Sequence, residues 1–451
     1  MTGVSLIIAF VVAIVVMILL ISKLKVHPFL AILAVSLLLA IVAGIPLTKI
    51  PGVIGSGFAG TFTSIGIVII LGAFIGFVLE KTGAAFQLAD IVIRLVGRRH
   101  PELAIELMGW VVSIPVFCDS GFVILNPVRK ALVRQTGASS VAMTVCLSCG
   151  LYVAHVFIPP TPGPLAAAQA LGLESHILLL FGIGILCSIF PLVAGYFYAR
   201  YIGKRVKSAE EGTNEATAKS YEALKAGFGP LPGPVNALAP LVVPILLMAV
   251  SSVFAMTHAT GWAADLFLFL GSPIIALGVG TLLAIWQLFS SGRGSEFYTL
   301  TNDILKTVGP ILFVTAAGGV LGKVIAESDM ARFVTEHANI FKQVGIFFPF
   351  LLAAIFKSAQ GSSTVAITTT AGIVAPLMSG LGFVTPVDAT LAVVAIGAGA
   401  MTVSHANDSY FWVVTSFGGL TPQDGYRTQT LMTLVIGLAA MVEVFILSLI
   451  F

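Results

Sequence analysis

Five ionisable side chains lie inside stretches of the sequence that are otherwise strongly apolar: Asp119, His155, Lys357, His405 and Asp408. A charge held at the centre of a lipid bilayer costs about 2.5–3.5 kcal/mol on insertion scales, so such a group usually marks a site of function. Histidine titrates near physiological pH, and burial raises the pKa of a carboxyl group toward that range. Asp119, Asp408, His155 and His405 are therefore candidates for carrying a coupling proton.

The same groups also allow a purely structural interpretation. Asp119 or Asp408 could pair with Lys357 or stabilise a helix end, and each histidine could be a packed core residue. Both interpretations stay open on the sequence alone.

Each of these side chains belongs to one of four short polar segments. The segments are PVFCDSG (115–121), AHVFIPPTPGP (154–164), KSAQGSST (357–364) and VSHANDSYFW (403–412). Free N–H groups at a helix N-terminus attract anions, glycine lets a ligand approach the backbone, and hydroxyl and amide side chains bond to other hydroxyls. The segments therefore suit a hydroxylated carboxylate. The predicted binding residues are Asp119, Ser120, Gly121, His155, Thr161, Gly361, Ser362, Ser363, Thr364, Ser404, His405, Asn407 and Asp408.

The composition places these segments in a membrane. Apolar residues make up 58% of the chain and charged residues 10%, with a mean hydropathy of +1.05. Soluble domains carry about 25% charged residues, so we predict an all-α protein that crosses the bilayer several times. A polar stretch from 200 to 236 is too short to form a separate soluble catalytic domain. The uninterrupted apolar spans are 3–21, 26–45, 62–80, 176–199, 237–256, 264–289, 308–326 and 429–451.

The polar segments interrupt four further apolar regions. Residues 103–135 and 345–378 each consist of two apolar arms. An arm of about 12 residues rises roughly 18 Å as a helix, a little over half of a hydrocarbon core of about 30 Å, so each region is predicted to be a re-entrant helical hairpin. Proline, glycine and polar residues divide 139–172 and 388–417, which are predicted broken helices. Irregular backbone at this depth requires a covering of protein or a wet cavity.

The two halves of the chain resemble each other. LGAFIGFVLEKTG (71–83) matches AGGVLGKVIAESD (317–329), and the hairpin breaks and the histidines His155 and His405 recur at a similar offset. Such similarity predicts a transporter built from two repeats of about five transmembrane helices, each with a re-entrant hairpin and a broken helix. The predicted division is a first repeat at 1–199, a cytoplasmic linker at 200–236 and a second repeat at 237–451.

The charge distribution predicts how the repeats are oriented. Because five spans is an odd number, the second repeat should be inverted relative to the first. Placing the linker in the cytoplasm puts most lysines and arginines on that side, as the positive-inside rule requires. Both termini then face outward. In inverted repeats the four breaks converge on one site halfway through the bilayer.

Four stretches together resemble a known family. FCDSGFVILNP, HVFIPPTPGP, AQGSSTVA and VSHANDSYFW, in this order and spacing, are similar to the motifs of the gluconate:proton symporter family, the gluconate permeases, and the resemblance covers essentially the whole chain. It implies the inverted-repeat fold of the ion-transporter superfamily, a homodimer with a scaffold and a moving transport domain, and a place in the bacterial inner membrane. The implied activity is proton-coupled import of gluconate or a related hydroxylated monocarboxylate. The expected partners are this substrate and membrane lipid, with no nucleic acid, no metal and no cofactor beyond the coupling ion.

Three segments depart from the usual motifs of that family. Cys118-Asp119-Ser120 stands where members tend to carry a glutamate, Thr161 interrupts what is usually a PPHPGP run, and QGSSTVA replaces a GSATVA tip. Because these positions surround the predicted site, the substrate stays open between gluconate, a shorter acid such as glycerate, and D-serine. Sodium stays open as the coupling ion.

Two other classes of function deserve comparison. Ser120 with a distant His155 is reminiscent of an intramembrane serine protease, but Cys118 stands where a GxSG motif needs glycine. The hairpins could also line the filter of a channel, although two inverted halves with broken helices favour alternating access. We therefore expect a transporter and no enzymatic activity.

Overall fold

The computed structural model describes residues 4–84, 87, 100–114, 116–212, 231–256, 260–329, 333, 336, 345–405 and 408–451. These residues form helices and contain no β-strand. The first half contains α1 (Val4–Ser22), α2 (Pro28–Val42), α3 (Ile50–Thr61), the π-helical η1 (Phe62–Gly66), α4 (Ile67–Lys81), α6 (Pro101–Val112), α7 (Cys118–Thr136), α8 (Ser140–Phe157), α9 (Pro162–Ala170), α10 (Ile177–Leu186), α11 (Ile189–Ile202) and η2 (Ala209–Gly212). The second half contains α13 (Pro234–Met256), α14 (Trp262–Leu270), α15 (Pro273–Ser290), η3 (Gly294–Glu296), α16 (Phe297–Glu327), α19 (Phe347–Gln360), α20 (Ser363–Val374), η4 (Ala375–Leu377), α21 (Met378–Leu381), α22 (Pro386–Met401), α23 (Ser409–Phe417), α24 (Pro422–Gly425), η5 (Tyr426–Thr430) and α25 (Leu431–Ile450).

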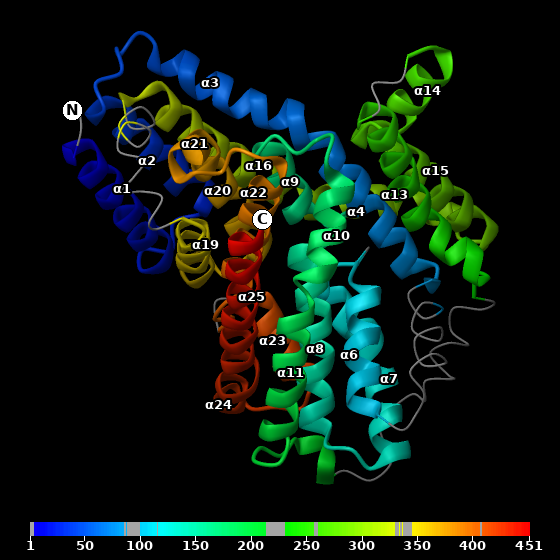
Figure 1. Cartoon of the computed structure of the whole chain (residues 1–451). Coiled ribbons are helices and arrows are strands. Elements are labelled where there is room, and N and C mark those ends of the chain that lie inside the picture. Colours follow the sequence, from blue (N-terminus) through cyan, green and yellow to red (C-terminus); the bar gives the residue numbers. More distant parts are fainter. Residues whose placement is uncertain are drawn as a thin grey trace.

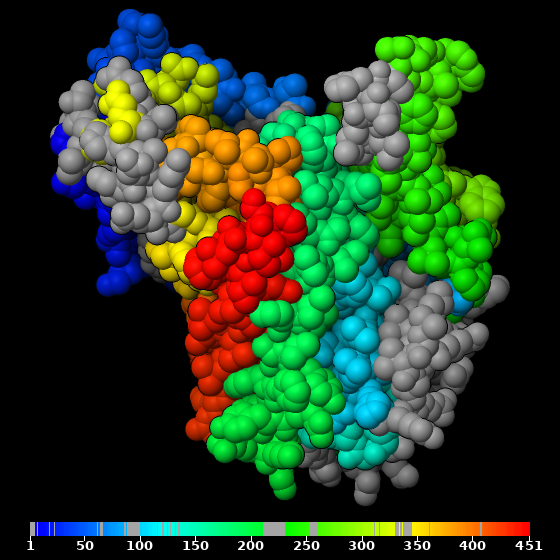
Figure 2. Space-filling view, in the orientation of Figure 1, coloured from blue at the N-terminus to red at the C-terminus, as the bar shows by residue number. Residues whose placement is uncertain are grey.

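The helices form a membrane protein with lipid-facing edges. α6, α8, α11 and α25 stand side by side at the centre, α1 and α2 lie at one edge, and α13 to α15 lie at the other (Figure 1). Figure 2 shows α11 and α25 meeting at one face of the molecule. Seven helical segments in the described part are long and apolar enough to cross a bilayer. On α15, Leu282, Trp286 and Phe289 are exposed, as a surface in contact with lipid requires.

Two helix pairs have their break at a polar tip. α6 ends at Val112 and α7 begins at Cys118, while α19 ends at Gln360 and α20 begins at Ser363. Gly361 lies between the second pair with a φ of 88°, a left-handed conformation that glycine adopts without a steric penalty. The sharp turn between α19 and α20 therefore depends on this glycine.

Two further helices are divided in the middle. α8 ends at Phe157, and α9 begins at Pro162, because the run of prolines between them cannot donate the hydrogen bonds of a continuous helix. α22 ends at Met401, and α23 begins at Ser409 with Asp408 as its N-cap. The breaks lie in the four polar segments; the inversion of the second half stays a prediction.

Four of the apolar spans that the sequence predicts differ from the helices. The span at 176–199 consists of two helices, α10 and α11, because α10 ends at Leu186 and α11 begins at Ile189. The span at 62–80 belongs to a longer helix, since α3, η1 and α4 follow one another without a gap. The glycines of α3 lower its hydropathy but permit close packing: a Cβ at Gly57 would lie 2.9 Å from the carbonyl oxygen of Gly319 on α16. The span at 308–326 is likewise only part of α16. The span at 264–289 is wrong as one helix, because Pro273 starts α15 as a new helix after α14.

The first arms of the two divided helices lie in the core. Every residue of α8 is buried, and nearly all of α22 is buried too. Glycine brings both helices close to their neighbours: a Cβ at Gly150 would lie 1.9 Å from the Glu106 carbonyl oxygen, and one at Gly397 would lie 2.6 Å from that of Val156. The divided helices therefore meet where covering protein can shield their irregular backbone.

The first residues of the linker are fixed to the helix bundle by Glu210. Its carboxylate lies 2.8 Å from Arg129 Nη2 and 2.9 Å from Lys130 Nζ, and it accepts a hydrogen bond from the Ser140 hydroxyl at 2.8 Å. Arg129 is fully buried and also donates to the Phe417 carbonyl. Burial alone would raise the pKa of Glu210, but the Arg129 guanidinium and these hydrogen bonds hold that pKa below its ordinary value.

We predict that Glu210→Gln destabilises the protein by about 1–2 kcal/mol at pH 7, less than for a fully buried pair because Glu210 is partly exposed. Since the pKa is lower in the folded state, the stabilisation is present above the unfolded value of about 4.3 and is lost as the pH falls through the folded value. Thermal unfolding of the detergent-purified protein measures the difference, which should shrink in acid. Lys130→Ala, which removes a half-exposed partner of the same carboxylate, should cost less than half as much; an equal cost would contradict the dominant role of Arg129.

Candidate functional site

An ion pair between Lys357 and Asp408 lies at the centre of the candidate site. Lys357 Nζ lies 2.6 Å from Asp408 Oδ2, and the two side chains are 0% and 5% exposed. Lys357 belongs to the last turn of α19, and Asp408 immediately precedes α23. Either charge alone at this depth would be costly, so each side chain requires the other.

Further hydrogen bonds hold the pair in place. Asp408 Oδ1 accepts from the backbone N–H of Tyr410 at 3.1 Å, and Oδ2 accepts from the Ser404 hydroxyl. Lys357 also donates to the backbone carbonyl of Gly361. The pair therefore joins the break between α19 and α20 to the break between α22 and α23.

Two side chains of α8 contact the start of α20. The hydroxyl of Tyr152 lies 2.6 Å from Ser363 Oγ, and His155 Nε2 lies 3.4 Å from Thr364 Oγ1. The other ring nitrogen of His155 is buried with no hydrogen-bond partner among the described residues. Lys357 Nζ stands 5.6 Å from the centre of the Tyr152 ring, within the range of a cation–π interaction. α8 thus adds aromatic and imidazole groups to the ion pair.

Asp119 lies at the same site but in a different electrostatic setting. It belongs to the first turn of α7, is partly exposed, and accepts a hydrogen bond from the Ser409 hydroxyl at 3.0 Å. In the described part of the chain no lysine, arginine or histidine forms an ion pair with it. The site therefore combines one carboxylate in an ion pair, Asp408, with one that starts a helix and whose described hydrogen bonds are with a hydroxyl and a thiol.

Two of the predicted binding residues, Gly121 and Thr161, are buried against neighbouring residues. A Cβ at Gly121 would lie 2.5 Å from Leu151 Cδ2, so this glycine allows α7 to pack against α8. Thr161 is buried, and its hydroxyl donates to the Ile158 carbonyl at 2.7 Å, which closes the turn before α9.

The remaining predicted residues lie on the breaks themselves. Ser362 is exposed and is the N-cap of α20, where its hydroxyl accepts from the backbone N–H of Val365. His405 is partly exposed, and its carbonyl accepts from the Asp408 N–H at 2.8 Å. The side chain of Ser120 and the whole of Asn407 lie outside the described residues.

Sequence analysis missed three contributors to this site: Tyr152, Ser409 and Tyr410. Tyr152 precedes His155 by three residues, so the two share one face of a helix, and that spacing was the available signal. Tyr410, on α23, packs against Tyr152. Its ring centre lies 5.1 Å from that of Tyr152, and its hydroxyl donates to the Ser148 carbonyl at 3.1 Å. The aromatic pair packs directly beside the ion pair.

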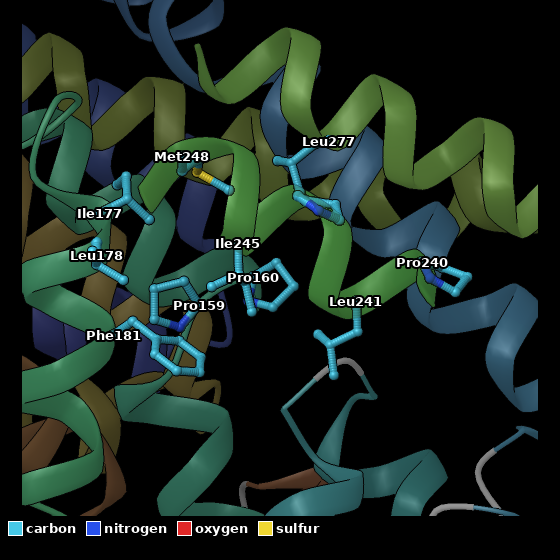
Figure 3. Close-up of a pocket in the computed structure, with 11 residues that line it drawn as sticks. Pro159, Pro160, Ile177, Leu178, Phe181, Pro240, Leu241, Ile245, Met248 and Leu277 are labelled. Atoms are coloured by element: carbon cyan, nitrogen blue, oxygen red, sulfur yellow. The ribbon is translucent and has the colours of Figure 1, made fainter. Parts of the chain in front are cut away.

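An apolar pocket between Pro159, Pro160 and the helices α10, α13 and α15 is too small to hold a substrate. Its volume is about 10 Å³, close to the smallest space that holds one water, about 10–15 Å³. Figure 3 shows Pro159 and Pro160 lying beside Phe181 and Ile245 in this pocket. The pocket is a small gap where the two prolines pack against α10 and α13.

Comparison with known proteins places this site in a transport protein. The family model described as "GntP family permease" matches residues 5–450. The chain belongs to the GntP permease family. The permease is 34% identical over 442 residues to the inner membrane permease YgbN of Escherichia coli K12, covering 94% of each chain. It is 29% identical over 442 residues to a gluconate permease of Zymomonas mobilis, covering 96% of this chain and 95% of that one.

A solved transporter shares the fold of the permease. The YdaH transporter of Alcanivorax borkumensis superposes with a TM-score of 0.65 at 15% sequence identity, over 94% of this chain and 97% of that one. This similarity concerns the fold alone. Together with the family match, it confirms the predicted all-helical membrane transporter.

We predict that Lys357→Met alone lowers the stability of the permease by about 3–5 kcal/mol, because it leaves Asp408 as a buried charge without its partner. The double variant Lys357→Met/Asp408→Asn removes both charges, keeps an N-cap for α23, and should recover most of the loss. The measurement is the apparent melting temperature of the detergent-purified protein, with the exposed Lys306→Met as control. A double variant less stable than the single one would contradict the ion pair.

Proposed function

We propose that this permease imports gluconate, or a related hydroxylated monocarboxylate, together with one proton that binds Asp119. The observation that carries the proposal is the unequal charge balance of the two carboxylates. Lys357 neutralises Asp408 at 2.6 Å, whereas the described contacts of Asp119 are with hydroxyl and thiol groups. Asp408 is therefore committed to the structure and Asp119 is free to change its protonation state.

A carboxylate substrate makes this difference important. An anionic ligand and an ionised Asp119 would place two negative charges in one site of low dielectric, where like charges repel strongly. A proton on Asp119 removes that repulsion and makes the loaded site neutral. Substrate and proton thus favour each other's binding, which is the requirement for coupled movement.

The other groups of the site suit a hydroxylated ligand. Ser363, Thr364 and Ser409 supply hydroxyls, Tyr152 supplies a phenol, and the start of α20 supplies backbone N–H groups for a carboxylate. Ser120 and Asn407 remain in the proposed binding set. His155 is the second candidate for the proton, because its buried ring nitrogen has no described partner.

The names of the relatives support the substrate and the location. A gluconate permease and an inner membrane permease are similar to this chain over almost its whole length. The proposal therefore includes the bacterial inner membrane. It also includes outward-facing termini and inverted repeats, which the charge pattern and the internal similarity predict, and a homodimer, which the family resemblance implies. Glycerate is the second substrate candidate, since Asp119, Thr161 and the tip at 360–363 depart from the usual family motifs. D-serine as substrate and sodium as coupling ion are tested as alternatives in the proteoliposome uptake experiment.

We predict that Asp119→Asn abolishes accumulation of labelled gluconate by proteoliposomes under an inward proton gradient, because the variant cannot bind and release the proton. Exchange of internal for external gluconate should continue, since a neutral side chain mimics the protonated state. Asp303→Asn, an exposed carboxylate on α16, should behave as wild type. Full accumulation by Asp119→Asn at neutral pH would remove this residue from the mechanism, and accumulation driven only by sodium would remove the proton.

A further inference from the structure

A second cavity lies beside the candidate site, between the helices α3, α9, α16 and α20. Its volume is about 450 Å³, within the range of about 300–1,000 Å³ typical of small-molecule sites. Its polar lining consists of Ser56, Gln169, Lys323 and Thr368, and the rest of the lining is glycine, alanine and proline. The cavity is therefore large enough and polar enough for a small hydroxylated acid.

One side chain of the lining is a buried amide whose oxygen accepts no hydrogen bond from the described residues. Gln169 is only 6% exposed, and its Oε1 has no hydrogen-bond partner among the described residues. A buried amide oxygen without a donor is unfavourable, so a ligand hydroxyl that donates to it would relieve the cost. Thr368 is buried beside it and donates to the Val365 carbonyl at 3.2 Å, which leaves its oxygen able to accept.

The positive charge of the cavity is available to an anion. Lys323 Nζ lies 2.9 Å from Glu327 Oε1, and the two side chains are 41% and 47% exposed. An exposed pair between neighbouring turns of a helix contributes little, so a substrate carboxylate can replace Glu327 as the partner of Lys323. The cavity thus offers a cation at its exposed side and hydroxyl-binding groups deeper inside.

The cavity and the candidate site share the helix α20. Thr368 follows Thr364, which contacts His155, by one turn of α20, and Gln169 lies on α9 beyond the proline break. α3, α9, α16 and α20 all lie in the same upper part of Figure 1. The charge pattern of the sequence predicts that the ends of these helices nearest the cavity face outward.

We propose that this cavity is a second, outer binding site for the hydroxylated monocarboxylate, in which Lys323 binds the carboxylate and Gln169 and Thr368 bind hydroxyls. The inference rests on the proposed function for the identity of the ligand. The substrate occupies this outer site before it reaches the breaks, so each chain binds two molecules. Without the substrate, Lys323 pairs with Glu327.

Equilibrium binding of labelled gluconate to the detergent-purified full chain tests this proposal, together with uptake kinetics in proteoliposomes. We expect two molecules per wild-type chain, and for Lys323→Met a Kd of the outer site and a KM that are each raised about tenfold, as the loss of one partly exposed charge-assisted contact implies. Gln169→Leu should weaken the outer site in the same way without lowering the melting temperature, because it removes a buried amide oxygen that has no hydrogen-bond partner among the described residues. Lys306→Met, on the same helix but far along it, is the matched control and should change neither value.

Two results of the binding and uptake measurements would overturn the proposal, and they are distinguishable. If wild type transports gluconate but binds one molecule, and Lys323→Met leaves KM unchanged, the outer site is wrong and the proposed function stands. If wild type neither binds nor transports gluconate, the proposed function fails and the outer site fails with it. Labelling of Ser56→Cys, in the lining of the same cavity, by a membrane-impermeant thiol reagent from outside, slowed by gluconate, would support the predicted side; labelling only from inside would contradict it.

Discussion

The contact between Lys357 and Asp408 is the constraint on which the rest of the site depends. Both side chains are buried where a single charge would be strongly unfavourable, so the α19–α20 break and the α22–α23 break must stay together. The backbone N–H of Tyr410 and the Ser404 hydroxyl donate two further hydrogen bonds to the carboxylate. Because this pair is neutral and internally satisfied, it positions the site without needing to bind the coupling ion.

The proposed proton coupling then depends on the second carboxylate of the site, Asp119. Asp119 begins α7 at the edge of the site, is partly exposed, and contacts Ser409 instead of a cation. A group in that position can gain a proton when an anion arrives and lose it when the anion leaves. In the proposed function the surrounding hydroxyls recognise the substrate, and the family match is to permeases.

Local chemistry made the breaks predictable from sequence. Pro159 and Pro160 lack the N–H groups that a continuing helix needs, Gly361 readily adopts the left-handed conformation that ends a helix, and polar residues in apolar runs mark the site. The partner of Asp408 could not be chosen, because sequence patterns do not give the distance between Lys357 and a residue on another helix. Tyr152 was missed for a related reason: a tyrosine in an apolar helix resembles a packing residue until its neighbours are known. Hydropathy also hid α3, whose glycines reduce the apolar signal while they pack against α16.

The number of charges moved per substrate tests the central claim most directly. If Asp408 stays paired and Asp119 alone gains a proton, one anion and one proton cross together and the cycle carries no net charge. Gluconate uptake by proteoliposomes can be driven separately by a pH difference and by a potassium-diffusion potential at equal pH. We predict accumulation with the pH difference and none with the potential alone. Accumulation driven by the potential at equal pH would show that further cations move, and it would contradict the assignment of a single proton to Asp119.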